Sequence, residues 1–240
     1  MGDRVEQAEQ PILLHIGMPK AASTFLQEVV FRQHVDILDV DARVLGHPVN
    51  PPDLAALLLD CDPEDFGLNR DRAVGLLDER ITAAPGSRAV WSSETFATGR
   101  GSLSRKKLVG RLAQCLKKAK ILLIVRNPAT AIIATYLQAC RNHELPNFDQ
   151  WFAQQVKQPE VVFDWYQFDQ IVTDFEAAFG EGTVTVLPFE ALKQMPDWFS
   201  ARLATFLGLS PESIAALVRA PAVNTAPTAR EVKLKSITRK

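Results

Sequence analysis

The chain has 240 residues and a formal net charge of −1 at pH 7. This length allows one sizeable core, or at most two small domains. The near-zero charge gives no bulk attraction for nucleic acid, so we expect no nucleic-acid partner, and any anion binding has to be local. Hydrophobic residues make up 47% of the sequence and charged residues 23%, which is ordinary for a globular protein.

The opening segment MGDRVEQAEQ is polar and lacks the apolar centre of a signal peptide. We therefore predict a flexible leader over residues 1–10. No apolar run approaches the length of a membrane span. The widely spaced Cys61, Cys115 and Cys140 form no CxxC pair and no Cys/His ligand spacing, so we expect free thiols, no metal site and a cytoplasmic location.

The segment PILLHIGMPKAASTF predicts a strand that feeds a helix through a short turn. Ile12–Ile16 is an apolar, strand-sized run, and 17–22 is the turn. Ser23 opens a helix over 23–33 that carries apolar residues at helical spacing. Backbone N–H groups at such a helix start point toward an anion. The sequence therefore predicts a phosphate-binding loop here, with a plain strand–helix corner as the alternative.

The rest of the chain alternates strands with helices. Further strands are predicted at 89–93, 121–125 and 183–187. Further helices are predicted at 53–60, 71–84, 104–118, 129–140, 148–156, 161–179, 201–207 and 211–218. The pattern predicts an α/β fold: a single P-loop-like domain over 11–225, with a mostly parallel central sheet of about four or five strands and helices on both faces. A basic C-terminal tail is expected over 226–240.

Three predicted strand ends carry chemically useful side chains. The first strand leads to Lys20, the second to Glu94 and the third to Arg126. Ligands of open α/β sheets bind beyond the carboxyl ends of the strands. A lysine supplies a point charge, an arginine can grip a phosphate through two donors, and a carboxylate can serve as a general base. Taken singly, Arg126 could equally form an ion pair and Glu94 could be an ordinary surface residue.

The loop is not a Walker A motif. That motif needs glycine immediately before its lysine and Ser or Thr directly after it. Here Ala21 and Ala22 separate Lys20 from Ser23 and Thr24. A P-loop nucleotide kinase or NTPase also wants an acidic Mg²⁺ ligand at a strand end, which is not present in good form. This class is therefore kept as an alternative.

Three segments together carry a family resemblance. LHIGMPKAASTFLQ resembles the 5′-phosphosulfate loop of sulfotransferases that use 3′-phosphoadenosine 5′-phosphosulfate (PAPS). ILLIVRNPATAIIATY resembles the motif of that family that binds the 3′-phosphate. FEAAFGEGTVTVLPFEAL, followed by FLGL, resembles its late helix–strand–helix and includes Glu190. The resemblance runs from about Ile12 to about Asn224 and is nearest to bacterial and Golgi-type members that act on glycans or small molecules.

The resemblance implies a set of donor-binding residues. They are Lys20, Ala21, Ala22, Ser23, Thr24 and Phe25 in the loop, Arg126 and Thr135 at the second motif, and Asn224 and Arg230 near the C-terminus. The chain departs from the family at two positions. Ala134 stands where the family has a serine, with Thr135 next to it. Ala22 replaces a loop glycine, which we expect to be tolerated through a negative φ.

The resemblance also implies the reaction. Some glycan sulfotransferases use a glutamate as the catalytic base, and Glu94 lies in the matching interval, which holds no histidine. His15 lies inside the first strand and is predicted to be a core residue. Lys20 and Glu94 would then serve catalysis. The expected activity is sulfuryl transfer from PAPS to a hydroxyl or amine of a small-molecule or carbohydrate acceptor, without a metal. A catalytically inactive PAPS-fold binding protein is the other alternative, and the acceptor and the oligomeric state stay open.

Overall fold

The computed structural model describes residues 11–40, 54–99, 103–116, 118–142, 146–157 and 163–219. These residues contain one five-stranded sheet in the order β2-β3-β1-β4-β5, and every pairing is parallel. The strands are β1 (Ile12–Ile16), β2 (Ile37–Asp39), β3 (Arg88–Ser93), β4 (Ala119–Val125) and β5 (Val184–Pro188). The predicted parallel α/β fold is confirmed.

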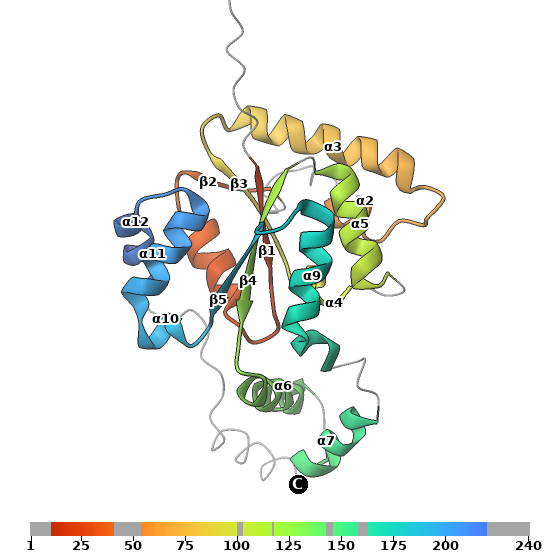
Figure 1. Cartoon of the computed structure of the whole chain (residues 1–240), viewed down its shortest axis with the longest axis vertical. Helices are drawn as coiled ribbons and strands as arrows, with labels where there is room; N and C mark the ends of the chain where they lie inside the picture. The colour runs from red at the N-terminus through yellow and green to blue at the C-terminus, as the bar shows by residue number, and fades with distance from the viewer. Residues whose placement is uncertain are drawn as a thin grey trace, which may run out of the picture.

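Helices cover both faces of this sheet. The helical segments are α1 (Ser23–Phe25), the π-helix η1 (Leu26–Phe31), α2 (Leu54–Leu58), α3 (Phe66–Ala83), α4 (Thr95–Thr98), α5 (Arg105–Cys115), α6 (Pro128–Asn142), α7 (Phe148–Val156), the 3-10 helix η2 (Phe163–Tyr166), α9 (Phe168–Phe179), α10 (Ala191–Gln194), α11 (Pro196–Leu207) and α12 (Pro211–Val218). In Figure 1, α10, α11 and α12 lie on one side of the sheet, and α2, α5 and α9 lie on the other.

The core forms where continuous aliphatic strands lie between these layers. All five residues of β1 are buried, and Ile121–Ile124 of β4 are fully enclosed. Strands that are buried on both faces read as unbroken apolar runs, which is why these two were predictable. Phe199 of α11 and Phe175 of α9 are fully buried and belong to the same core.

Several boundaries differ from the prediction. The edge strand β2 was missed because its three residues are too few to give a pattern. The helix predicted over 161–179 is broken at Gln167, whose φ of −81° and ψ of 69° are not helical. Ser104 is at the N-cap of α5, but its side chain makes no capping hydrogen bond. The predicted leader 1–10 and the basic tail 226–240 lie outside the described residues.

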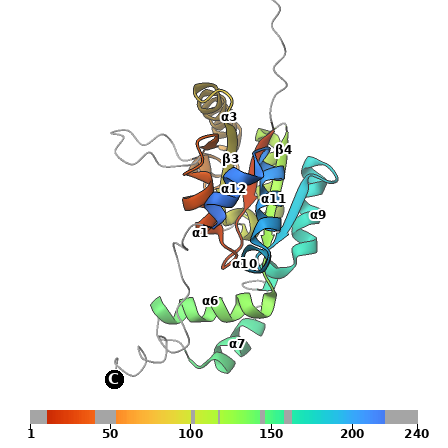
Figure 2. The same ribbon diagram turned by 90° about the vertical axis from the view of Figure 1, so that its left-hand side faces the viewer.

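Helices α6 and α7 lie beyond the carboxyl ends of the strands, apart from the two main layers (Figures 1 and 2). An aromatic cluster of Tyr136, Phe148 and Trp151 joins them, with ring centroids 5.3–6.0 Å apart. The Tyr136 hydroxyl donates to the carbonyl of Pro146 at 3.0 Å. Trp151 is thus mainly a packing residue. None of the described helices is long and apolar enough to cross a membrane.

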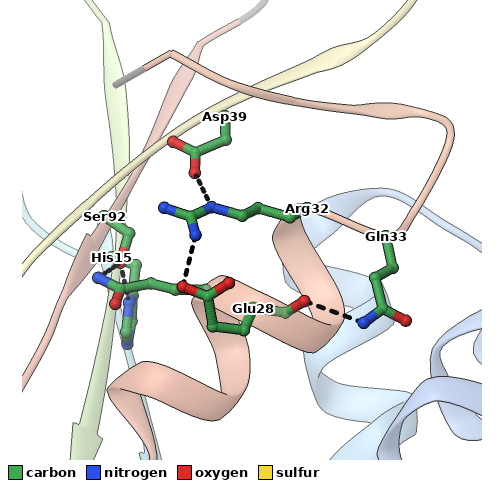
Figure 3. A network of polar contacts seen from close by, with 7 residues as sticks. His15, Glu28, Arg32, Gln33, Asp39 and Ser92 are labelled. Atoms are coloured by element: carbon green, nitrogen blue, oxygen red, sulfur yellow. Dashed lines mark hydrogen bonds and ion pairs between the residues drawn. The ribbon is translucent and has the colours of Figure 1, made fainter. Parts of the chain in front are cut away.

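His15 is buried in the middle of β1, as the sequence predicted. Its Nδ1 lies 2.7 Å from Oγ of Ser92 on the neighbouring strand β3, and Gln27 of η1 donates to the same hydroxyl at 2.9 Å. Figure 3 shows this pair beside the contacts that Arg32 makes with Glu28 and Asp39. Burial lowers the pKa of His15 to about 3, so the ring is neutral at physiological pH.

This burial predicts a pH-dependent stability. The imidazole takes up a proton below pH 6.5 in the unfolded chain, but only near pH 3 in the folded one. Between these values, acidification therefore favours unfolding, by about 1.4 kcal/mol per pH unit for one proton. Urea unfolding at pH 6.5 and at pH 5 should show a smaller loss of stability for His15→Gln than for the wild type. Equal losses would show that His15 does not contribute.

Candidate functional site

The loop after β1 lies against the end of β3. The Gly17 N–H donates to the carbonyl of Ser93 at 3.1 Å. A Cβ on Gly17 would stand 2.9 Å from Cγ of Glu94 and 2.9 Å from Oγ of Ser23. Real Cβ atoms do not come that close, so only glycine allows this approach of loop, helix start and carboxylate. Two of the three predicted strand ends therefore meet at Gly17.

The backbone of the loop adopts the left-handed conformation twice. Lys20 has a φ of 63° and Ala22 a φ of 64°. The expectation of a negative φ at Ala22 is wrong. The left-handed region costs an L-residue about 1–2 kcal/mol, and such strain is retained where the surroundings enforce it. The loop keeps the shape that a glycine would take freely, and the strained alanine is the N-cap of α1.

The hydroxyl residues at the start of α1 are not equivalent. Ser23 is buried, and its Oγ donates to the carbonyl of Met18 at 3.1 Å, which closes the loop. Thr24 is exposed, while Phe25 packs against the core. The first N–H groups of any helix lack an intrahelical acceptor. The Ala21 N–H donates to the Met18 carbonyl at 3.1 Å, so the amides available to an anion are those at the start of α1, beside the exposed Thr24, while Ser23 holds the shape of the loop.

Arg126 connects the second motif to this loop. Its Nη1 donates to the carbonyl of Lys20 at 2.7 Å, and its Nε donates to Oγ1 of Thr130 at 3.2 Å. The guanidinium carbon lies 4.8 Å from the centroid of the Phe189 ring. Burial lowers the pKa of Arg126, while Glu190 and Tyr166 raise it, and the group stays charged. A half-buried cation is thus held directly against the strained loop.

The turn that carries Arg126 is itself fixed by capping. The Asn127 Oδ1 accepts from the backbone N–H of Ala129 at 3.0 Å and so caps α6. The Asn127 N–H donates to Oε1 of Glu190 at 3.0 Å. Glu190 therefore ties the end of β4 to the segment after β5. The sequence pointed to this glutamate through the family's late segment, but it gave no sign of the bond.

The substitution at Ala134 leaves a hydroxyl nearby but not in the same place. Ala134 is buried, whereas Thr135 is half-buried and its Oγ1 donates back to the carbonyl of Ala131 at 2.9 Å. The Tyr166 side chain lies close to both Thr135 and Arg126. Burial raises the pKa of Tyr166, while these two neighbours lower it. Tyr166 Oη is buried and has no partner in hydrogen-bonding geometry among the described residues.

Glu94 is exposed at the end of β3, where it is the N-cap residue of α4. A half-buried ion pair lies behind this short helix: Arg105 Nε lies 2.8 Å from Oδ2 of Asp174. The Arg105 Nη1 donates to the carbonyl of Ala97 at 3.2 Å. The carboxylate of Glu94 is thus presented to solvent from a fixed backbone.

The structure brings the three predicted strand ends together around one loop. Glu94 lies beside Gly17, and Arg126 holds the carbonyl of Lys20. Tyr166 is an addition to the predicted residues, and it lies near Thr135 and Arg126. Asn224 and Arg230 lie outside the described residues. Among the residues that are described, no group of three His, Cys, Asp or Glu could hold a metal ion.

Comparisons with known proteins agree with this arrangement. Residues 102–213 match the model of the sulfotransferase family. A sulfotransferase from Alicyclobacillus acidocaldarius superposes with a TM-score of 0.59 at 19% identity, covering 95% of this chain and 90% of that one. The sulfotransferase domain of the Synechococcus PCC 7002 olefin synthase superposes with a TM-score of 0.53 at 14% identity, covering 96% of this chain and 95% of that one.

A third structure, the sulfotransferase domain from the curacin biosynthetic pathway, gives a TM-score of 0.55 at 15% identity, with 92% and 82% coverage. At these identities the structures show the shared fold. A search of curated protein sequences finds no match. The family match itself includes Arg126, Thr135, Tyr166 and Glu190 of the site.

The strained loop generates a stability prediction. Ala22→Gly should raise the free energy of unfolding by about 0.5–1 kcal/mol, because relief of the left-handed strain outweighs the added entropy of the unfolded chain. Ala21→Gly is the matched control: Ala21 is buried, its φ is not positive, and the change should destabilise. Chemical denaturation measures both. A destabilised Ala22→Gly variant would contradict the strain.

Proposed function

We propose that this chain, whose residues 102–213 match the model of the sulfotransferase family, transfers a sulfuryl group from PAPS to a hydroxyl or amine of a small-molecule or carbohydrate acceptor. The observation that carries the proposal is the hydrogen bond from Arg126 to the carbonyl of Lys20, with Glu94 beside the same loop at Gly17. It joins an anion-binding arginine, a lysine and a carboxylate at the carboxyl edge of one parallel sheet.

The residues present fit a donor that carries two phosphate groups. Gly17 leaves a cradle that a Cβ would fill, beside the start of α1, where the first backbone N–H groups lack an intrahelical acceptor. Lys20 and Thr24 add a charge and an exposed hydroxyl to this cradle. At the second motif, the buried Tyr166 hydroxyl without a partner lies near Arg126. We assign the 5′-phosphate to the loop and the 3′-phosphate to Arg126, Thr135 and Tyr166.

PAPS supplies an activated sulfuryl group. Glu94 accepts the proton of the acceptor hydroxyl or amine as that atom attacks sulfur, while the bond between sulfur and the 5′-phosphate oxygen breaks and adenosine 3′,5′-bisphosphate leaves. Lys20 and the loop amides stabilise the negative charge that develops on the leaving side, and their positions are already set by the fold. Since Lys20 and the helix start supply the positive field, the reaction needs no metal. Arg126 and Thr135 position the donor and take no part in proton transfer.

The acceptor would enter from the side of α6 and α7, which lie beyond the carboxyl ends of the strands. The relatives from olefin synthase and from curacin biosynthesis are domains of biosynthetic enzymes, which favours a small-molecule acceptor. Cys61, Cys115 and Cys140 are all free thiols, in line with action in the reducing cytoplasm.

Sulfuryl transfer from labelled PAPS to a panel of acceptors tests the catalytic roles. Lys20→Ala should lower kcat by at least about a hundredfold, because a donor aimed at the developing charge is lost. Glu94→Gln should lower kcat by about 10²–10⁴-fold with little change in donor affinity. Lys193→Ala, at an exposed lysine of α10, is the control and should keep wild-type activity. Full turnover in Lys20→Ala would refute the assignment, whereas full turnover in Glu94→Gln would remove only Glu94.

Binding of adenosine 3′,5′-bisphosphate tests the donor site independently of the acceptor. Calorimetry in the presence of EDTA should show metal-independent binding. Arg126→Lys should weaken it by about 10–100-fold, because the planar fork of donors is lost while the charge is kept. Arg202→Lys is a matched control, since Arg202 also lies over an aromatic ring, that of Trp198. Binding that requires Mg²⁺ would favour a nucleotide kinase or NTPase instead.

A further inference from the structure

A cavity lies on the flank of the molecule, between α5 and the segment that joins α2 to α3. Its volume is about 650 Å³, within the range of small-molecule sites. Helix α5 contributes one face, and the linking segment the other. The lining residues are Leu59, Asp60, Cys61, Asp62, Pro63, Phe66, Leu103, Lys107, Gly110, Arg111 and Gln114. None of them belongs to the site described above.

Arg111 is the unusual member of this lining, because it is buried with 9% exposure. Its Nη1 donates to the carbonyls of Leu58 at 3.0 Å and Cys61 at 3.2 Å. Its guanidinium carbon lies 4.8 Å from the centroid of the Phe66 ring. Among the described residues, no carboxylate lies within ion-pair distance of Arg111, and its Nε and Nη2 donate no hydrogen bond. Neither nitrogen is an enclosed donor without a partner, so the donors that Nη1 leaves over are open to solvent at the cavity that Arg111 lines.

The same construction occurs at Arg126. There too, Nη1 holds a backbone carbonyl and the guanidinium carbon lies 4.8 Å from the centroid of a phenylalanine ring, that of Phe189. In each case, a backbone carbonyl and a ring fix the arginine. Among the described residues, Nε and Nη2 of Arg111 and Nη2 of Arg126 make no hydrogen bond, whereas Nε of Arg126 donates to Thr130. Arg126 is our proposed anion ligand. The repetition of this arrangement in a cavity points to a second anion site.

The remaining lining residues define the ligand further. Lys107 lies one helical turn before Arg111 and adds a second cation. Phe66 and Leu103 provide apolar wall. The exposed carboxylates of Asp60 and Asp62 disfavour an anion of high charge, such as a nucleotide bisphosphate. Gly110 leaves the floor open, since a Cβ there would meet no atom within 4 Å.

We propose that this cavity binds a small monoanion with an apolar or aromatic body, its acidic group between Arg111 and Lys107 and its body against Phe66 and Leu103. Aryl or alkyl sulfates, sulfonates and carboxylates share this chemistry. The site is separate from the donor site, so it can be occupied together with adenosine 3′,5′-bisphosphate. Its occupation does not depend on the proposed sulfuryl transfer.

The test uses the full chain and 8-anilinonaphthalene-1-sulfonate, an aromatic monoanion whose fluorescence rises in apolar sites. Titration is done with and without saturating adenosine 3′,5′-bisphosphate. We expect one binding event that the bisphosphate does not remove. Gly110→Leu, which fills the cavity, should abolish this event. Gly110→Ala should retain it, because a methyl group occupies little of the volume.

Charge variants keep the test decisive if Gly110→Leu fails to fold. Lys107→Glu should weaken the probe by about tenfold, since it removes one charged contact. Lys106→Glu, at the exposed neighbour outside the lining, is the matched control and should leave the affinity unchanged. The bound probe should also slow maleimide labelling of Cys61, measured in a Cys140→Ser background. Equal weakening by both lysine variants, or complete displacement by the bisphosphate, would overturn the proposal.

Discussion

The site depends on one hydrogen bond, from Nη1 of Arg126 to the carbonyl of Lys20. It joins the end of β4 to the loop after β1, two segments 106 positions apart in sequence. Lys20 has a left-handed backbone, which an L-residue adopts at a cost, so its carbonyl direction needs an external partner. A charged donor makes that bond about twice as strong as a neutral one. The charge that would attract a phosphate thus also maintains the loop that would bind another.

Contacts of this kind also explain why the loop can hold alanine at position 22, where the loop that it resembles has a glycine. Ala22 carries strain that glycine would not, and three contacts offset it: the Arg126 bond, the Ser23 hydroxyl on the Met18 carbonyl, and the packing of Phe25 on the core. Gly17 stays glycine because the obstacle there is steric, with Glu94 and Ser23 only 2.9 Å from its missing Cβ. The conformational strain at Ala22 can be offset by contacts elsewhere in the loop, whereas the overlap of atoms that a Cβ on Gly17 would cause cannot.

Side-chain patterns in the sequence predict some features of the site, and backbone conformation determines others. The apolar runs of β1 and β4 and the polar residues that follow them predicted the sheet, Lys20 and Arg126, because burial on both faces leaves a plain pattern. The positive φ at Ala22 could not be predicted from the sequence, since an alanine does not indicate a left-handed backbone as a glycine does. The position of Tyr166 could not be predicted either. It follows from the break in the helix at Gln167, and that break depends on tertiary contacts.

Arg111 and Arg126 show how a local pattern can conceal an arrangement. In the sequence, Arg111 is one of several basic residues in a predicted helix, and Arg126 follows a predicted strand. In the structure, both hold backbone carbonyls and lie 4.8 Å from the centre of a phenylalanine ring. A guanidinium is suited to this because its planar face stacks on the ring while its edge carries several donors. The face and part of the edge fix the group in place, and the donors that remain are the ones that we propose to bind an anion at each arginine.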